Sequence, residues 1–364
     1  MVQRTPLCEV HRALGAKMVP FSGWEMPLSY SGVTDEHRAV RVGVGLFDIS
    51  HMGRFALSGK GAEAYLDGIT PGPVRKMSRG GAQYSMLLNP QGGILDDIYV
   101  YKQGSDRFFI IVNAANRAKD FAWMTGRLPA SGPTLVDVSG TTALIALQGP
   151  KSWEVLVQII PFGKSEIALR TFVETEMVPV RGVKVLIART GYTGEKGYEL
   201  VVPSEAAPAV WNALMAAGAS AGIQPIGLGA RDTLRLEMGY LLYGHDMTET
   251  TLPTAAGLAR FIDFEKDFVG KAALSRDARP SQTLVGFSLL ANGIPREGCV
   301  IYSDQKEIGR VTSGNFSPTL KKGIGMGYVD ARYAEEGAEI LVSIRGKAAA
   351  AVITPRPFYV KKKK

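Results

Sequence analysis

Two periods of apolar residues follow one another along roughly the first 275 positions. Apolar residues at every second position are typical of half-buried strands, and a three- to four-residue period is typical of amphipathic helices. The first pattern predicts strands at 54–58, 82–88, 94–102, 107–112, 143–147, 179–189 and 197–202. The second predicts helices within 1–50 and at 33–41, 61–69, 115–126, after Pro150, 204–217 and 228–238, with a turn region at 22–27 and loops in the rest of 1–50. Helices mixed with antiparallel hairpins indicate an α+β class.

The pattern changes after about residue 275. Short strands separated by Gly-rich turns follow without helices, at 283–289, 299–303, 306–313, 323–329, 338–343 and 348–354. Strands of this spacing predict a small closed or sandwiched β-domain. We therefore expect an α+β region at 1–275, an all-β domain at 280–360 and a basic tail at 361–364.

Two adjacent carboxylates, Asp96 and Asp97, interrupt the apolar strand 94–102. Successive strand residues face opposite sides of a sheet, so Asp97 shares a face with Tyr99 and Tyr101. Asp96 shares the other face with aliphatic residues, where a carboxylate needs a hydrogen-bonding partner to offset its lost hydration. The aromatic face around Asp97 indicates a wall for a flat ligand. The alternative is a strand end whose two acids make only capping and turn contacts.

A second segment, 191–200, combines a Gly-rich turn with aromatic and acidic residues. Tyr192 and Glu199 flank this turn and are able to meet on one side of a hairpin. A carboxylate beside an aromatic ring suits a flat heterocycle that carries several N–H donors. A hairpin loop with a surface glutamate is the alternative interpretation.

A third segment, 229–239, places Arg231 and Arg235 four residues apart on one face of a predicted helix. An arginine is able to bind a ligand carboxylate through two parallel hydrogen bonds. Pairing with Asp232 or Glu237 in a structural network is the alternative, and it is open separately for each arginine.

Composition narrows the function classes. The chain has 364 residues, 46% hydrophobic and 21% charged, as in ordinary globular proteins. No apolar run reaches the ~18 residues of a membrane helix, no signal or transit peptide is expected, and two distant cysteines give no disulfide framework. A cytoplasmic location is therefore expected. The four histidines lack metal-ligand spacing, so no metal is expected.

The formal net charge of +8 favours an anionic partner, either a small polyanionic ligand or an acidic protein. The basic residues form no obvious stripe, so a nucleic-acid partner is not expected. A phosphate-binding loop of the Gly-x-x-x-x-Gly-Lys-Ser/Thr kind is absent from the sequence. Without metal spacing or a Ser–His arrangement, an enzyme of this composition is expected to work by positioning and electrostatics.

Six segments, taken in order, resemble the aminomethyltransferase, or T-protein, family of the glycine cleavage system. They are 21–27 (FSGWEMP), 48–53 (DISHMG), 93–97 (GILDD), 191–195 (GYTGE), 230–237 (ARDTLRLE) and 313–322 (SGNFSPTLKK). The resemblance covers nearly the whole chain. It implies a three-domain cloverleaf in which two interleaved α+β domains surround a central folate site and a small β-barrel forms the third domain.

The resemblance also implies a reaction and its partners. The one-carbon unit of an aminomethyl group on the lipoyl arm of the H-protein passes to tetrahydrofolate. The products are 5,10-methylenetetrahydrofolate, ammonia and the reduced lipoyl arm. Tetrahydrofolate is then a co-substrate, and the lipoylated H-protein is the protein partner.

The family's site residues are carried over position by position. Asp97 is implied to lie near N10 of the folate and to assist its attack on the carbon centre. Glu199 is implied to accept N–H bonds from the pterin, Tyr192 to line it, and Arg231 to contact the glutamate tail. Residues at the remaining positions implied to line the folate site are Met52, Tyr84, Tyr99, Ile111 and Asn113. Asp96 is expected to have a structural role.

Folate-binding relatives without aminomethyl transfer are the alternatives. The iron–sulfur-cluster repair branch carries a Cys-containing motif, whereas no cysteine lies near 191–195. Sarcosine and dimethylglycine oxidases carry a flavin domain, and no dinucleotide fingerprint is present. The non-enzyme alternative is a basic nucleic-acid-binding module, whose affinity would fall steeply with salt and would not respond to folate.

Overall fold

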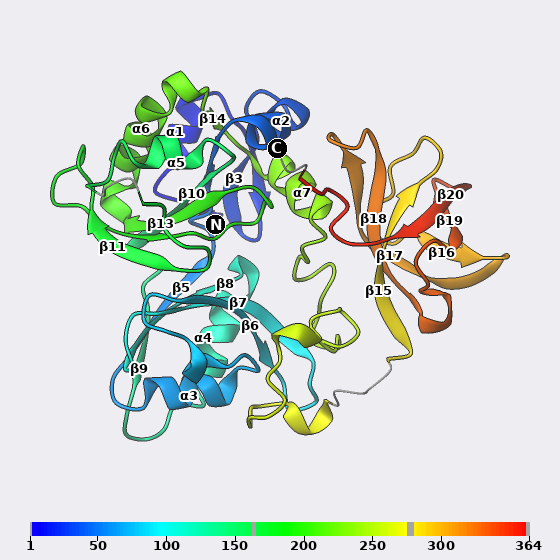
Figure 1. Cartoon of the computed structure of the whole chain (residues 1–364), viewed down its shortest axis with the longest axis horizontal. Coiled ribbons are helices and arrows are strands. Elements are labelled where there is room, and N and C mark those ends of the chain that lie inside the picture. The colour runs from blue at the N-terminus through cyan, green and yellow to red at the C-terminus, as the bar shows by residue number, and fades with distance from the viewer. Residues whose placement is uncertain (1, 162–164, 275–279, 362–364) are drawn as a thin grey trace. The chain divides into compact units, whose positions relative to one another are not determined.

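The computed structural model describes residues 2–161, 165–274 and 280–361 (Figure 1). Residues 362–364, most of the expected basic tail, lie outside the described residues. The chain forms two compact units. The first unit comprises the chain up to Leu87 together with Asp96–Arg231, and the second comprises Leu88–Leu95 and the chain from Asp232 onward.

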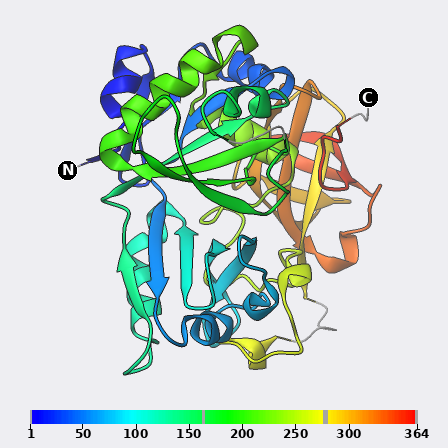
Figure 2. The same ribbon diagram turned by 60° about the vertical axis from the view of Figure 1, so that its left-hand side comes forward.

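A six-stranded sheet in the first unit has the order β11-β12-β13-β10-β4-β14. Ile145 and Leu200 are paired across two of its central strands and are fully buried. Helices α5 and α6 contribute to the same hydrophobic core, with Trp211 of α6 fully buried, and they cover one face of the sheet (Figure 1 and Figure 2). The elements are β4 Gly45–Asp48, β10 Thr142–Gln148, β11 Phe172–Glu176, β12 Lys184–Ala188, β13 Gly197–Pro203, β14 Gln224–Pro225, α5 Ser152–Leu156 and α6 Ala207–Ala217.

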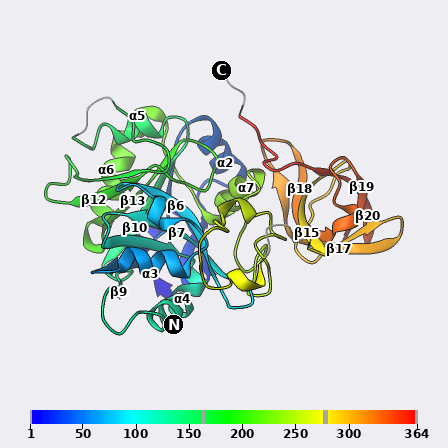
Figure 3. The ribbon, with the colours of Figure 1, turned by 60° about the horizontal axis from the view of Figure 1, so that its bottom comes forward.

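The sheet that holds the acid pair has five strands in the order β6-β7-β8-β5-β9. Strand β7 pairs with β8 antiparallel, and Tyr99 lies opposite Ile111. Helix α3 contacts β8 and helix α4 contacts β9 (Figure 3). The elements are β5 Gly53–Ser58, β6 Ala82–Leu88, β7 Ile94–Lys102, β8 Arg107–Val112, β9 Thr134–Asp137, α3 Ala62–Ile69 and α4 Arg117–Thr125.

The prediction of a turn region at 22–27 is wrong except for its first two residues. Ser22 and Gly23 alone make a hairpin turn, both with positive φ, and Phe21 pairs with Trp24 across it. Two successive left-handed residues match the twist of a tight hairpin, which explains the glycine at this position. The result is a small sheet of order β1-β3-β2, built from β1 Gln3–Arg4, β2 Lys17–Phe21 and β3 Trp24–Ser29. Helices α1 Cys8–Ala13 and α2 Val33–Val42 belong to the same stretch.

The predicted strand at 179–189 is correct only in its second half. The hairpin partner β11 was not predicted, and residues between the two strands turn through Gly182, whose φ is +77°. Positive φ excludes these residues from a continuous strand and favours glycine. The other predicted strands and helices up to α7 Leu228–Glu237 are present, with bounds that differ by a few residues.

The second unit contains a closed barrel of six strands, as predicted, in the order β15-β18-β17-β16-β19-β20. Its core is formed by alternate inward residues such as Phe287, Val311 and Val342. Strand β17 has a register shift between Val311 and Ser313, and it continues past its predicted end at residue 313 to Ser317. The strands are β15 Gln282–Leu289, β16 Val300–Ser303, β17 Lys306–Ser317, β18 Lys322–Asp330, β19 Glu339–Ile344 and β20 Lys347–Thr354. Among the described residues, no helix has the length and apolar character needed to cross a membrane.

Candidate active site

Asp97 lies on β7 and is held by the residue that follows β8. The side-chain amide of Asn113 donates a 2.7 Å hydrogen bond to Oδ1 of Asp97, and a 3.2 Å contact joins the same nitrogen to the backbone carbonyl of Asp97. The hydroxyl of Tyr84, on β6, is also hydrogen-bonded to this carboxylate. Strands β7 and β8 pair directly, so their register brings Asn113 beside Asp97.

The carboxyl group of Asp97 has an unusual acidity. Loss of hydration and the nearby charge of Asp96 raise its pKa to about 7, against the opposing hydrogen bonds from Asn113 and Tyr84. An acid with a pKa near neutrality exchanges its proton readily under physiological conditions, a property that active-site acids often share.

Asp96 has the hydrogen-bonding partners that its burial requires. Its side chain is fully buried on the opposite face of β7. It accepts hydrogen bonds from the Asn113 backbone N–H at 2.9 Å, the Asn113 side-chain amide at 2.9 Å and the Asn116 side-chain amide at 2.6 Å. The expectation of a partner for Asp96 is confirmed. Asn113 directly precedes the short helical turn η2 (Ala114–Asn116), and Asn116 ends this turn directly before α4.

The aromatic face predicted around Asp97 is present. The rings of Tyr99 and Tyr101 lie 5.4 Å apart between centroids, and Tyr101 also contacts Phe109 of β8 edge-on. Tyr101 is fully buried, whereas Tyr99 is only partly buried. Strand alternation therefore places a partly exposed aromatic ring beside the partly exposed acid.

Glu199 lies at the third position of β13 and is also held by several donors. The hydroxyl of Thr190 donates to Oε2 of Glu199 at 2.5 Å, and Tyr101 is hydrogen-bonded to the same carboxylate. Loss of hydration raises the pKa of Glu199, while Thr190, the positive charge of Arg231 and Tyr101 oppose the shift. Thr190 and Tyr101 were not identified from the sequence as site residues.

Arg231, on α7, lies over the ring of Tyr192. The guanidinium carbon is 4.7 Å from the ring centroid, and Nη2 is 4.0 Å from the sulfur of Met52. A cation over an aromatic face is stabilised by the ring quadrupole. The charge of Arg231 also acts on the carboxylate of Glu199. The pKa of the buried His51 is lowered, mostly by loss of hydration and also by the charge of Arg231.

The nine predicted site residues all belong to the first unit and form two groups. One group lies on or beside β6, β7 and β8, and the other consists of Met52, Tyr192, Glu199 and Arg231. Tyr84 connects the two groups. Burial raises its pKa most, and the nearby side chains of Asp97 and Tyr192, one from each group, raise it further. The hydrogen bond between Tyr101 of β7 and Glu199 is a second connection between the two groups.

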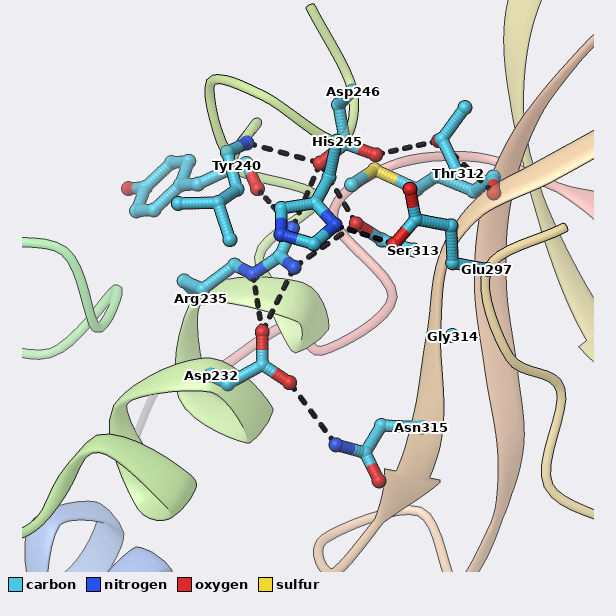
Figure 4. A network of polar contacts seen from close by, with 12 residues as sticks. Asp232, Arg235, Tyr240, His245, Asp246, Glu297, Thr312, Ser313, Gly314 and Asn315 are labelled. Atoms are coloured by element: carbon cyan, nitrogen blue, oxygen red, sulfur yellow. Dashed lines mark hydrogen bonds and ion pairs between the residues drawn. The ribbon is translucent and has the colours of Figure 1, made fainter. Parts of the chain in front are cut away.

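Arg235 makes the structural network that was the alternative for this helix (Figure 4). Its guanidinium donates to Asp232 at 2.9 Å, to the buried Asp246 at 2.9 Å and to the Ser313 hydroxyl at 2.9 Å. Asp232 in turn accepts from Asn315 at 3.0 Å. Of the two arginines on the predicted face, Arg235 therefore belongs to packing within the second unit, and only Arg231 remains a ligand-binding candidate.

The comparisons with known proteins agree over the full length of the chain. The model of the GCVT N-terminal domain matches residues 7–266, and that of the glycine cleavage T-protein C-terminal barrel domain matches residues 282–359. The aminomethyltransferase of Geobacillus kaustophilus is 45% identical over 363 residues, covering 99% of each chain. That of Chlorobaculum parvum is 46% identical and covers 98% of each.

The crystal structure of glycine cleavage system aminomethyltransferase T from Bartonella henselae superposes with a TM-score of 0.91 at 35% identity, covering 99% of this chain and 98% of that one. The chain belongs to the glycine cleavage T-protein family. Membership confirms the α+β fold with a C-terminal barrel, and it favours aminomethyl transfer over the folate-binding alternatives. Within the described ranges, no group of three His, Cys, Asp or Glu side chains is arranged to hold a metal ion.

Proposed function

We propose that this T-protein family member transfers the one-carbon unit of an aminomethyl group from the lipoyl arm of an H-protein to tetrahydrofolate. The carbon–nitrogen bond of the aminomethyl group breaks with release of ammonia, and the carbon–sulfur bond breaks to return the lipoyl thiol. The carbon ends as the methylene bridge of 5,10-methylenetetrahydrofolate. The observation that carries the proposal is the joined cluster of Asp97, Tyr192, Glu199 and Arg231 in a chain of this family.

The cluster fits the parts of a reduced folate in turn. Glu199 offers a carboxylate acceptor for the N–H groups of a pterin, and the Tyr192 ring offers an aromatic surface for it. Arg231 supplies the cation for a glutamate-tail carboxylate. Apolar and amide contacts come from Met52, Tyr84, Tyr99, Ile111 and Asn113.

Asp97 would act on the bridging amine at N10. A carboxylate there orients the nucleophilic nitrogen and stabilises the cationic iminium that develops when ammonia leaves. Asn113 and Tyr84 restrict the rotation of this carboxylate, since both bond to it. The site then works through positioning and charge, with all groups supplied by the first unit.

Activity is expected to rise with pH through about 7. Asp97 stabilises a cation only when ionised, and its pKa lies at about 7, so the carboxylate population grows as pH rises through that value. A pH profile of kcat/KM for ammonia release measures the midpoint. In Tyr84→Phe the aromatic ring stays but the hydroxyl that lowers the pKa of Asp97 is lost, so the midpoint moves to higher pH. A flat wild-type profile across neutral pH would contradict the assignment.

Replacing Arg231 with alanine is expected to weaken tetrahydrofolate binding by about 1–3 kcal/mol, the scale of hydrogen bonds to a charged group. Isothermal titration calorimetry measures the loss. Tetrahydropteroate, which lacks the glutamate tail, is the matched ligand, and its affinity should change much less. Equal losses for both ligands would show that Arg231 acts through Tyr192 and the site's shape instead of the tail.

An assay of ammonia release from aminomethyl-loaded H-protein tests the proposed function as a whole. Release should depend on added tetrahydrofolate and yield the methylene product. Binding that ignores folate but falls steeply with salt would favour the nucleic-acid alternative instead. We also propose a cytoplasmic location, because the two cysteines, Cys8 and Cys299, are both free.

A further inference from the structure

A third buried acid lies behind the pair on β7. Asp120, on α4, is fully buried. Neither of its carboxylate oxygens receives a hydrogen bond from an N–H or O–H donor in the described part of the chain. The charged side chain that acts on it most strongly is another acid, Asp96. A buried carboxylate with no donor is costly, so this arrangement needs a specific explanation.

Two carboxyl groups are able to form a hydrogen bond only if one of them keeps its proton. Three N–H groups from Asn113 and Asn116 point at Asp96 and favour its charged form. Asp120 has no comparable donor, and burial and the charge of Asp96 raise its pKa far above the usual range. The asymmetry of the donors therefore assigns the proton to Asp120 and the charge to Asp96.

We propose that Asp120 is a positioning residue that remains protonated at neutral pH, donates its proton in a hydrogen bond to Asp96, and thereby sets the ionisation of Asp97. The connection runs through one amide. The side-chain nitrogen of Asn113 lies 2.9 Å from Asp96 and 2.7 Å from Asp97, so its two hydrogens bridge the acids. Among the described residues, Asp120 forms no hydrogen bond with Asp97.

The charged groups around Asp120 leave Asp96 as its dominant neighbour. From β7 it faces Asp96 and, more weakly, Asp97, and on its own helix the cation of Lys119 acts in the opposite direction. Arg117 on the same helix is paired with Asp137 of β9 at 2.7 Å. A neutral Asp120 keeps the charge on Asp96, and this charge in turn keeps the pKa of Asp97 near neutrality.

The inference rests on the proposed function for its kinetic test. Asp120→Asn retains a donor to Asp96 and should keep the acid limb of the kcat/KM profile at the wild-type position. Asp120→Leu removes the donor, so Asp96 becomes neutral more easily and no longer opposes ionisation of Asp97. The acid limb should then move to lower pH by about one unit. A residue that serves only packing would alter stability in both variants without separating their pH profiles.

Infrared spectroscopy tests the protonation itself, without substrate or turnover. At about pH 9, where Asp97 with its pKa of about 7 is ionised, wild-type protein should show a carboxylic-acid carbonyl band that Asp120→Asn lacks. Absence of that difference overturns the proposal, even if Asp120→Leu fails to fold. Coincident acid limbs for Asn and Leu, or a shift in Asp120→Asn, also overturn it. If wild-type enzyme shows the band but no folate-dependent ammonia release, the proposed function fails and the protonated acid stands.

Discussion

Replacing Asp97 with asparagine is expected to lower kcat for folate-dependent ammonia release about 100-fold or more, the scale of one lost electrostatic contact in a transition state. Asparagine keeps the size of the side chain but cannot supply negative charge beside a developing cation. Asn113 and Tyr84 donate to this group, and an amide oxygen still accepts one such bond. The fold should therefore persist. Single-turnover kinetics with loaded H-protein measures the effect on the chemical step.

Asp106→Asn is the matched control for this substitution. Asp106 is exposed in the turn between β7 and β8 of the same sheet. Its replacement by asparagine therefore removes the same charge from the same unit without changing the site. Its turnover should equal that of the wild type. If Asp97→Asn is as active as Asp106→Asn, Asp97 has no part in the mechanism.

Replacing Arg235 with methionine is expected to destabilise the second unit by about 3–5 kcal/mol, the cost of leaving one member of a buried ion pair alone. The side chain of Arg235 is 4% exposed and that of its partner Asp246 is 0% exposed. Methionine fills a similar volume but donates nothing to Asp246, Asp232 or Ser313. Urea unfolding followed by circular dichroism measures the change.

Arg310→Met separates this effect from loss of a surface charge. Arg310 lies on barrel strand β17 and pairs with Glu307 at 2.7 Å, but both side chains are about half exposed. Exposed pairs contribute roughly 0–1 kcal/mol, so this variant should unfold near the wild-type midpoint. Similar stabilities for the two variants would mean that the network in Figure 4 does not hold the unit together.

Much of the fold could be predicted because its strands and helices bury one face. The six barrel strands and the helices at 33–42 and 62–69 follow directly from apolar periodicity. The hairpin around Ser22 and Gly23 was missed because its strands are only partly buried, so their alternation is weak. Strand β11 was missed for the same reason, since its exposed residues include two glutamates.

The site could be predicted where strand alternation carries the information. That rule placed Asp97 with Tyr99 and Asp96 on the opposite face, and the geometry agrees. The same rule placed Tyr101 on this face, but its hydrogen bond to Glu199 depends on a strand of another sheet and was not predicted. The burial of Asp120 could not be predicted, because a polar residue on a helix of mixed polarity gives no sign that it is buried. Which arginine of α7 is structural also depended on tertiary partners, which the helical spacing does not specify.

The position of tetrahydrofolate relative to the second acid of β7 is the most direct test of the proposed site. A crystal structure of the complex should place N10 within hydrogen-bonding distance of the Asp97 carboxylate, roughly 3 Å. The same structure should show the pterin against Tyr192 with its N–H groups directed at Glu199. A folate bound elsewhere, or one whose N10 lies out of reach of Asp97, would contradict the proposed mechanism.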